Sequence, residues 1–308
     1  MTYMANHHQQ RTKLEQESPI SLLPEGCIAA IISCTTPRET CRLSLVSSIF
    51  KSAAESDVVW ESFLPADYQT IISKSSPCPS SSSSSTSSLL GLPSKKDLFL
   101  SLCNQPILID DGKKFFSLDK QSGKICCMIS SRDLTIVWGD TPKYWRWTSL
   151  PGARFQEVAE LIGVCWLGIS GKISTQILSP GTNYAAYLVF KPTAGSYGFE
   201  NQPVEVSVGL VGTENQKRSV YLVTGRRLCM QYLLGRPPSL LYRSRRVKWQ
   251  ASLARERGDD WLEVELGDFY NTGDENGELE ISILETRGGH WKGGLIIQGI
   301  EIRPKQGV

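Results

Sequence analysis

The stretch that decides the fold of the amino-terminal part is Ser18-Pro19-Ile20-Ser21-Leu22-Leu23-Pro24-Glu25-Gly26-Cys27-Ile28-Ala29-Ala30-Ile31-Ile32. Pro24 suits the first position of a helix, where its missing N–H costs no hydrogen bond. Ile28, Ile31 and Ile32 then recur at helical spacing. The stretch therefore predicts a short helix that begins near Pro24 and carries one apolar stripe.

Two further short helices are predicted before residue 65. Thr36 followed by Glu39 has the form of a capping box, so a second helix begins there. Asp57 can cap a last helix that carries Trp60. A core built by three such helices is small and marginal by itself. Either this is a subdomain packed on the rest of the chain, or a partner covers its remaining apolar face.

The spacing of apolar and proline residues between 18 and 64 carries a family resemblance. The residues concerned are Leu23, Pro24, Ile31, Ile32, Pro37, Arg38, Glu39, Cys41, Val46, Ser47, Phe50, Val59, Trp60, Phe63, Leu64 and Pro65. Their pattern resembles the F-box, whose members dock on a Skp-type adaptor and so join a cullin–RING ubiquitin ligase. The resemblance implies that a subset faces the adaptor or supports that face: Leu23, Pro24, Ile28, Ile32, Pro37, Cys41, Val46 and Phe50.

The bulk composition excludes several classes of partner. The 308 residues leave room for one small and one larger domain, and the net charge of only +2 gives no global case for nucleic acid or an anionic membrane. No apolar run is long enough to predict a transmembrane helix. Residues 1–17 are polar and lack the apolar core of a secretory signal, so we expect a disordered tail there.

The nine cysteines are odd in number, and no CxxC pair is matched by a second one. Neither a disulfide framework nor a zinc site is therefore indicated. Reduced thiols are typical of proteins in the cytoplasm and nucleus, which is the localisation we expect. We expect no cofactor and no metal.

Composition also predicts the domain boundaries. Residues 73–88 are almost pure serine with two prolines, a composition typical of a flexible linker, which we place at 65–106. Within it, 95–102 can form a short helix. The linker is predicted to separate the F-box-like module at 18–64 from a domain at 107–304, with a tail at 305–308.

The larger domain is predicted to consist of strands. The segments with a continuous apolar run or alternating apolar residues are 184–190, 204–208, 262–266, 279–283 and 295–302. Only 155–162 has convincing helical spacing. Short alternating strands limited by turns predict an antiparallel sandwich or barrel. The predicted fold class is therefore α+β: a three-helix module followed by an all-β antiparallel sandwich.

Few residues in this chain suit catalysis. Only three histidines are present, and His290 stands alone in a glycine-rich turn. No nucleophile elbow or phosphate-binding loop is present. The sequence therefore argues against an enzyme.

Aromatic and acidic residues are the stronger signal. Trp138 and Trp145 flank a Gly-Asp-Thr-Pro turn, and such rings either stack on sugars or fill the core. The acidic residues between 259 and 285 either accept hydrogen bonds from hydroxyls or form a solvated sheet face. Glu278 has the outward parity of its strand, whereas Glu285 has the inward parity and either ends the strand or follows a bulge. The Arg-rich segment 226–257 favours a solvated loop over a nucleic-acid site.

Several motifs of the larger domain carry a second resemblance. They occupy 134–140, 144–147, 157–161, 166–167, 171–173, 184–191, 261–267 and 289–297. From about residue 107 to 304 the chain resembles the phloem protein two (Nictaba-like) lectins, and with the F-box it is similar to the B-type plant F-box proteins with a phloem-lectin domain. Lectins of this family bind N-acetylglucosamine oligomers and parts of N-glycans. The resemblance implies a carbohydrate site formed by Trp138, Trp145, Glu278 and Glu285.

Both resemblances together imply a substrate receptor of a Skp–cullin–F-box ubiquitin ligase. Its lectin-like domain would bind N-acetylglucosamine-containing or high-mannose glycans on target proteins, misfolded ones included. The alternative is a lectin-fold module that binds protein without sugar in the same ligase. A third reading, a nucleic-acid-binding phloem protein that uses the Arg-rich segment, is disfavoured by the net charge.

Overall fold

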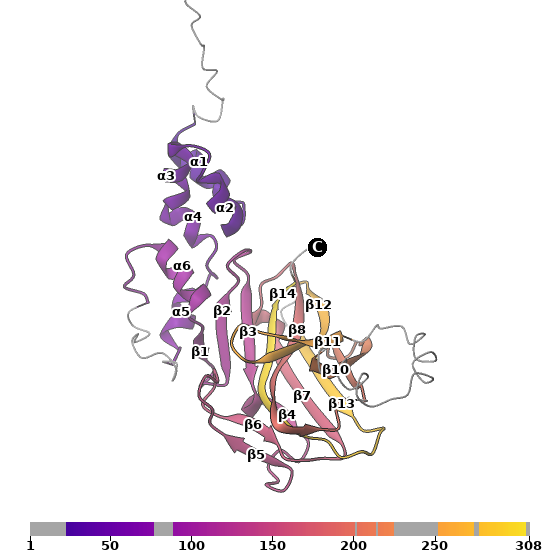
Figure 1. Cartoon of the computed structure of the whole chain (residues 1–308). Helices are drawn as coiled ribbons and strands as arrows, with labels where there is room; N and C mark the ends of the chain where they lie inside the picture. The colour runs from indigo at the N-terminus through magenta and orange to yellow at the C-terminus, as the bar shows by residue number, and fades with distance from the viewer. Residues whose placement is uncertain are drawn as a thin grey trace, which may run out of the picture.

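The computed structural model describes residues 23–76, 89–200, 202–213, 215–224, 252–273 and 277–305. The tail predicted at 1–17, all of the 305–308 tail except Lys305, most of the serine-rich linker and most of the Arg-rich segment lie outside these residues. Within the described ranges, the chain forms a group of short helices followed by a large, mostly antiparallel β domain (Figure 1). This confirms the predicted α+β fold class.

Four short helices make up the region that resembles the F-box. They are α1 (Glu25–Ser33), α2 (Pro37–Leu43), α3 (Ser48–Glu55) and α4 (Asp57–Glu61). The Thr36 side chain accepts a hydrogen bond from the Glu39 N–H at 3.2 Å, as the capping box predicts. Helix α3 was not predicted from the sequence, and its start is capped by the Ser47 hydroxyl, which accepts from the Phe50 N–H. The prediction that Asp57 caps α4 is wrong, because Asp57 lies inside that helix and its carboxylate accepts instead from the Lys95 N–H at 2.8 Å.

Two more helices lie within the predicted linker. Helix α5 (Tyr68–Ser73) was missed by sequence analysis, whereas α6 (Lys95–Asn104) confirms the short helix predicted there. Their apolar residues are buried together with those of α1, α3 and α4 and with Phe116 of strand β2 (Lys114–Leu118). The helices and the start of the β domain thus share one hydrophobic core, and they are not separated by a simple tether. The exact boundaries at residues 64 and 106 stay a prediction.

Aromatic contacts join α4 to α6, and a turn of the β domain contacts α2. The Trp60 and Phe99 rings lie 5.3 Å apart, and Phe63 packs against both. At the turn after β2, Gln121 accepts a hydrogen bond from the Arg38 N–H at 3.3 Å, so this turn contacts the start of α2. A side chain at Gly123 in the same turn would press on Pro37, since its Cβ would lie 3.3 Å from that ring. The β2 hairpin therefore supports the helices directly.

The β domain consists of two layers joined at one side. One layer has the strand order β1 (Ile107–Ile109), β2, β3 (Ile125–Ser130), β14 (Gly293–Pro304), β8 (Thr182–Tyr197) and β12 (Leu262–Asn271), and continues through β11 (Ser252–Glu256). The other has the order β10 (Lys217–Thr224), β9 (Val204–Leu210), β13 (Glu278–Glu285), β7 (Leu167–Ser174) and β4 (Thr135–Ile136). Strand β11 pairs with β12 and, in parallel, with β10, which joins the layers.

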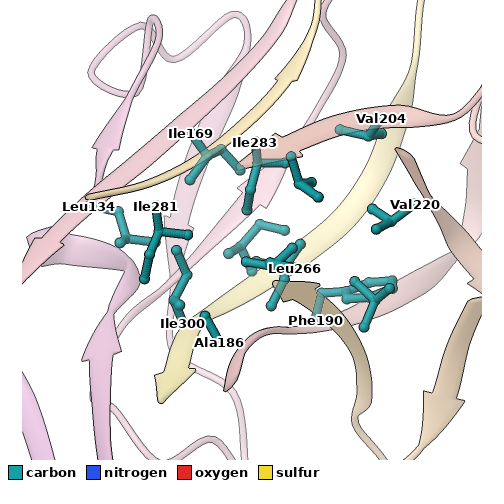
Figure 2. Packing of buried hydrophobic residues seen from close by; sticks show 14 of the residues in the cluster. Leu134, Ile169, Ala186, Phe190, Val204, Val220, Leu266, Ile281, Ile283 and Ile300 are labelled. Atoms are coloured by element: carbon teal, nitrogen blue, oxygen red, sulfur yellow. The ribbon is translucent and has the colours of Figure 1, made fainter. Parts of the chain in front are cut away.

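The core of this domain lies between the two layers. Figure 2 shows Ile169, Ile281 and Ile283 from one layer facing Ala186 and Ile300 from the other. Period-two alternation correctly predicted β9, β12 and β13, whose inward residues, such as Val206, Val264 and Ile281, belong to this core. The apolar runs that became β8 and β14 were also predicted correctly.

The helix predicted at 155–162 is wrong. Residues Val158–Leu161 form strand β6, which pairs with β14 and with β5 (Trp145–Thr148). Phe155 precedes the strand and packs on Phe115, with the ring centroids 4.8 Å apart. The backbone hydrogen bonds offered by β14 therefore outweigh the helical spacing of so short a segment.

An ion-pair network covers part of the outer face of the first layer. Arg303 donates to both carboxylate oxygens of Glu263, at 2.9 and 2.6 Å, and its guanidinium lies 3.8 Å from the centre of the Tyr187 ring. Burial raises the pKa of Glu263, but the hydrogen bond and charge of Arg303, with Arg255 and Arg257, outweigh it and lower the pKa to about 2. Because the pKa of Glu263 is lower in the folded protein than in the unfolded chain, its ionised carboxylate stabilises the fold at pH values above the usual carboxyl pKa. This stabilisation is lost as the pH falls towards 2.

Adjacent phenylalanines on β2 test whether the helices depend on the β domain. Phe116 is 1% exposed in the core shared with the helices, whereas Phe115 is 3% exposed in a separate cluster on the opposite face. Either change to Ala should cost roughly 3–5 kcal/mol of unfolding free energy through the cavity it leaves. Only Phe116→Ala should also raise hydrogen exchange in α4 and α6. Equal protection of these helices in the two variants would contradict the shared core.

Candidate binding surfaces at the two ends of the molecule

Large apolar side chains that remain exposed in the described part of the chain gather mainly at two places. One group lies on the first helices: Leu23, Ile31, Leu45, Val46, Ile49 and Val58. The other lies on loops and strand ends of the β domain: Val137, Trp138, Ile162, Trp166, Tyr197, Leu284 and Trp291. Contiguous exposed apolar patches typically mark interaction sites. We call the first group the helical surface and the second the loop surface.

The helical surface is formed by the turns and outer faces of α1 to α4. Leu45 and Val46 lie in the turn between α2 and α3 and are 86% and 66% exposed. Their backbone N–H groups donate to Arg42 and Leu43, so the turn is a continuation of α2 that holds both side chains outward. The apolar area therefore projects from structured backbone.

The residues that the F-box resemblance implies divide between this surface and the core below it. Leu23, Pro24, Cys41 and Val46 are exposed and Phe50 is half-buried, whereas Ile28, Ile32 and Pro37 are buried. Such a division is compatible with residues that face a partner and residues that support that face. The exposure of Leu45 and Val58 was not predicted, because isolated apolar residues in a turn or on a five-residue helix have no periodic signal.

The loop surface is built around a stack of aromatic rings. The Trp138 and Trp166 rings lie 6.1 Å apart with 19° between their planes, and Tyr144 packs against Trp138 at 5.3 Å. Trp166 and Trp291 are about half exposed, at 51% and 53%. Trp138 has a positive φ of 58°, which is strained for a bulky residue and points to a constraint of function.

Three loops carry the tryptophans of the loop surface. The turn after β4 carries Trp138, the connection between β6 and β7 carries Trp166, and the connection between β13 and β14 carries Trp291. The turn after β4 is fixed on β7 by the hydrogen bond from the Val137 N–H to the Gly168 carbonyl at 2.9 Å. The exposure of Trp166 and Trp291 was not predicted, since neither has a neighbour in sequence that indicates it.

The four residues implied as a carbohydrate site are not brought together as that prediction requires. Trp145 is only 2% exposed, and its indole N–H donates to the Val137 carbonyl at 3.2 Å, so neither ring face is free to stack on a sugar. Trp138 alone of the two tryptophans reaches the surface. It is 37% exposed.

The two glutamates lie at opposite ends of β13. Glu278 pairs in register with Ser174 and Glu285 with Leu167, so they lie seven positions apart, about 23 Å along an extended strand. Glu278 faces solvent, as its parity predicts, and forms an exposed ion pair with Lys172 at 3.2 Å. Glu285 ends the strand and is buried, 5% exposed, against Lys292. The prediction that both accept hydrogen bonds from one sugar is therefore not supported by this geometry.

The described residues contain no group of three or more His, Cys, Asp or Glu side chains able to hold a metal ion. Among the same residues, no helix is both long and apolar enough to cross a membrane. The features that do stand out are thus the two apolar surfaces. In Figure 1 the first helices and strands β5 and β6 lie at opposite ends of the molecule.

Comparison with known proteins gives matches in both halves. A family model described as F-box domain matches residues 20–62, and one described as Phloem protein 2 matches residues 124–304. Putative F-box protein PP2-B12 of Arabidopsis thaliana is 46% identical over 92% of this chain and 97% of its own length. F-box protein PP2-B1 of the same plant is 43% identical over 94% of this chain and 91% of its own length.

Solved structures are similar in outline only. A beta-(1,4)-mannanase of Podospora anserina, titled GH26-CBM35, aligns with 59% of this chain and 28% of its own at a TM-score of 0.31 and 12% identity. Likeness this weak supports no inference about ligands.

The burial of the two neighbouring tryptophans predicts opposite effects of truncation. Trp145→Ala should cost roughly 3–5 kcal/mol of unfolding free energy, because it leaves a cavity in the core. Trp138→Ala should leave the melting temperature nearly unchanged, since the ring is partly exposed and alanine at the same positive φ is strained to a similar degree. Thermal unfolding followed by circular dichroism measures both. A stable Trp145→Ala variant would contradict the core position of this residue.

Proposed function

Since this chain belongs to the phloem protein 2 family and carries an F-box domain in front, we propose that it is a substrate-receptor subunit of a Skp–cullin–F-box ubiquitin ligase. In this proposal the helical surface docks on a Skp-type adaptor, and the loop surface binds N-acetylglucosamine-containing or high-mannose glycans on target proteins. The protein supplies binding and positioning, and the ubiquitin-transfer chemistry belongs to other subunits.

The observation that carries the proposal is the pair of apolar surfaces on one body. A receptor must hold its adaptor and its target at the same time without the two colliding. The first helices and strands β5 and β6 lie at opposite ends of the molecule (Figure 1), and the shared core around Phe116 and Phe99 packs the helices on strands β1 to β3 of the β domain. A bridging role follows from this arrangement more directly than a catalytic one.

Sugar binding is supported by the chemistry of the exposed rings. Tryptophan and tyrosine offer flat apolar faces with a polar group at the edge, which suits the C–H face and hydroxyls of a sugar ring. Trp138, Trp166 and Trp291 provide such faces on adjacent loops. Glu278 is too remote to contribute, and Trp145 is enclosed, so the proposed site differs from the one that the resemblance implied.

A protein-binding role without sugar is the second candidate, and one observation favours it. Val137, Ile162 and Leu284 flank the rings and are 44%, 41% and 39% exposed. Aliphatic side chains offer neither a flat face nor a polar group, and they suit an apolar stretch of polypeptide better than a sugar. The loop surface could then hold exposed segments of misfolded proteins.

We further propose that the protein works in the cytoplasm and nucleus. All cysteines that the structure describes are free thiols, Cys27, Cys34 and Cys41 among the exposed ones. Free exposed thiols persist where glutathione keeps the compartment reducing. The ubiquitin ligase machinery of the proposal operates in these same compartments.

Adaptor docking can be tested at the turn between α2 and α3. Changing both Leu45 and Val46 to Asp should abolish co-purification with a Skp-type adaptor, because few anchors carry most of an interface's free energy. The change should not unfold the protein, since both side chains are exposed. Leu90→Asp with Val211→Asp is the matched control, as these residues are 48% and 45% exposed outside both surfaces. Adaptor binding retained by the Leu45/Val46 variant would overturn the proposed docking face.

Titration calorimetry of the full chain with chito-oligosaccharide separates the two candidate roles of the loop surface. Under sugar binding, Trp166→Ala should weaken the affinity by roughly 1–3 kcal/mol through lost apolar contact. Leu284→Ala should change it little, because an aliphatic residue at the margin adds no ring face. No heat of binding with the unmodified protein would reject the sugar role and leave the protein-binding one.

A further inference from the structure

Glu285 and Lys292 form a buried ion pair below the loop surface. Glu285 is the last residue of β13 and Lys292 directly precedes β14, so the pair closes the base of the loop that joins these strands. The Lys292 Nζ contacts Oε2 of Glu285, and the two side chains are 1% and 5% exposed. No other ion pair among the described residues has both side chains so fully enclosed.

Each member of the pair is also tied to backbone. Oε1 of Glu285 accepts a hydrogen bond from the Gly288 N–H at 2.9 Å, inside its own loop. The Lys292 Nζ donates to the Cys165 carbonyl at 2.7 Å, in the connection between β6 and β7. The main chains of Lys292 and Val164 exchange two further hydrogen bonds of 2.9 Å. The pair thus joins two loops at their bases.

Those two loops carry exposed rings of the loop surface. Trp166 follows Cys165 directly, and Trp291 precedes Lys292 directly. The end of β8, with Tyr197, is pressed against the same place: a Cβ at Gly198 would lie 2.5 Å from the Trp291 carbonyl and 2.7 Å from Lys292 Cβ. A change in the pair would therefore reach Trp166, Trp291 and Tyr197 within one residue.

A buried ion pair is a poor source of stability, because removing both charges from water offsets most of their attraction. Its benefit is geometric. The Lys292 ammonium group must meet one carboxylate and one carbonyl at fixed positions, which an apolar contact would not demand. Binding sites depend on such supporting residues to hold the contact residues in place.

We propose that Glu285 and Lys292 are positioning residues of the loop surface: they hold the loops of Trp166 and Trp291 in register and do not touch the ligand. This inference rests on the proposed sugar-binding function for its affinity readout only. It assigns to Glu285 a role different from that of a direct hydrogen-bond acceptor for sugar.

The test uses the full chain in three variants: Glu285→Gln, Lys292→Met, and both changes together. Each single change leaves one buried partner unpaired and should lower the melting temperature. The double variant removes both charges at nearly constant volume and should regain most of the wild-type stability. It should still bind chito-oligosaccharide about tenfold more weakly, because the loops are no longer fixed. Its amide hydrogen exchange should rise in 162–166 and 288–292 and stay unchanged in β7 and in residues 182–190 of β8.

The matched control is the ion pair at the other end of the same strand, changed in the same way: Glu278→Gln with Lys172→Met. It is about half exposed and should leave stability, affinity and loop exchange unchanged. Wild-type affinity and wild-type loop exchange in the Glu285/Lys292 double variant would overturn the proposal. Loss of affinity in Glu285→Gln alone, with Lys292→Met binding normally, would show a direct ligand contact instead. If the unmodified protein binds no sugar, the proposed function fails, and loop exchange still decides the positioning role.

Discussion

Burial of one apolar cluster that spans the helices and the first strands is the constraint on which the rest of the structure depends. Four helices of fewer than ten residues each cannot bury enough apolar area to be stable alone. Helix α6 and strand β2 supply the missing surface through Phe99 and Phe116, which are fully buried. The helices therefore take their stability, and also their orientation, from the β domain.

This constraint gives the two exposed apolar surfaces a defined relation. An adaptor on the helical surface and a target on the loop surface would be held by the same rigid chain of contacts. Receptors joined by a long flexible segment leave the target free to sample many positions, whereas a shared core restricts it. In a ubiquitin ligase such restriction would select which lysines of the target come within reach of the transfer site.

The sequence predicts those features that depend on neighbours along the chain. Alternation at 204–208, 262–266 and 279–283 correctly identified strands, and parity placed Glu278 outward and Glu285 inward. Contacts between distant segments were not accessible in this way. The strand at 158–161 was misassigned because its pairing with β14, more than a hundred residues away, leaves no local pattern, and nothing nearby in sequence marks the stacking of Trp166 on Trp138. Trp145 was implied as a sugar-binding residue, but it is buried in the fold, where β5 pairs with β6. This pairing could not be read from the residues around it.

Native-state hydrogen exchange in increasing urea shows whether the helices and the β domain form one cooperative unit. Amides of α1 and α4 should merge with those of β2 and β3 into one opening reaction with the same free energy and the same dependence on urea. Helix amides that exchange through a separate opening of lower free energy, with β2 and β3 still protected, would contradict the account and make the helices an independent module.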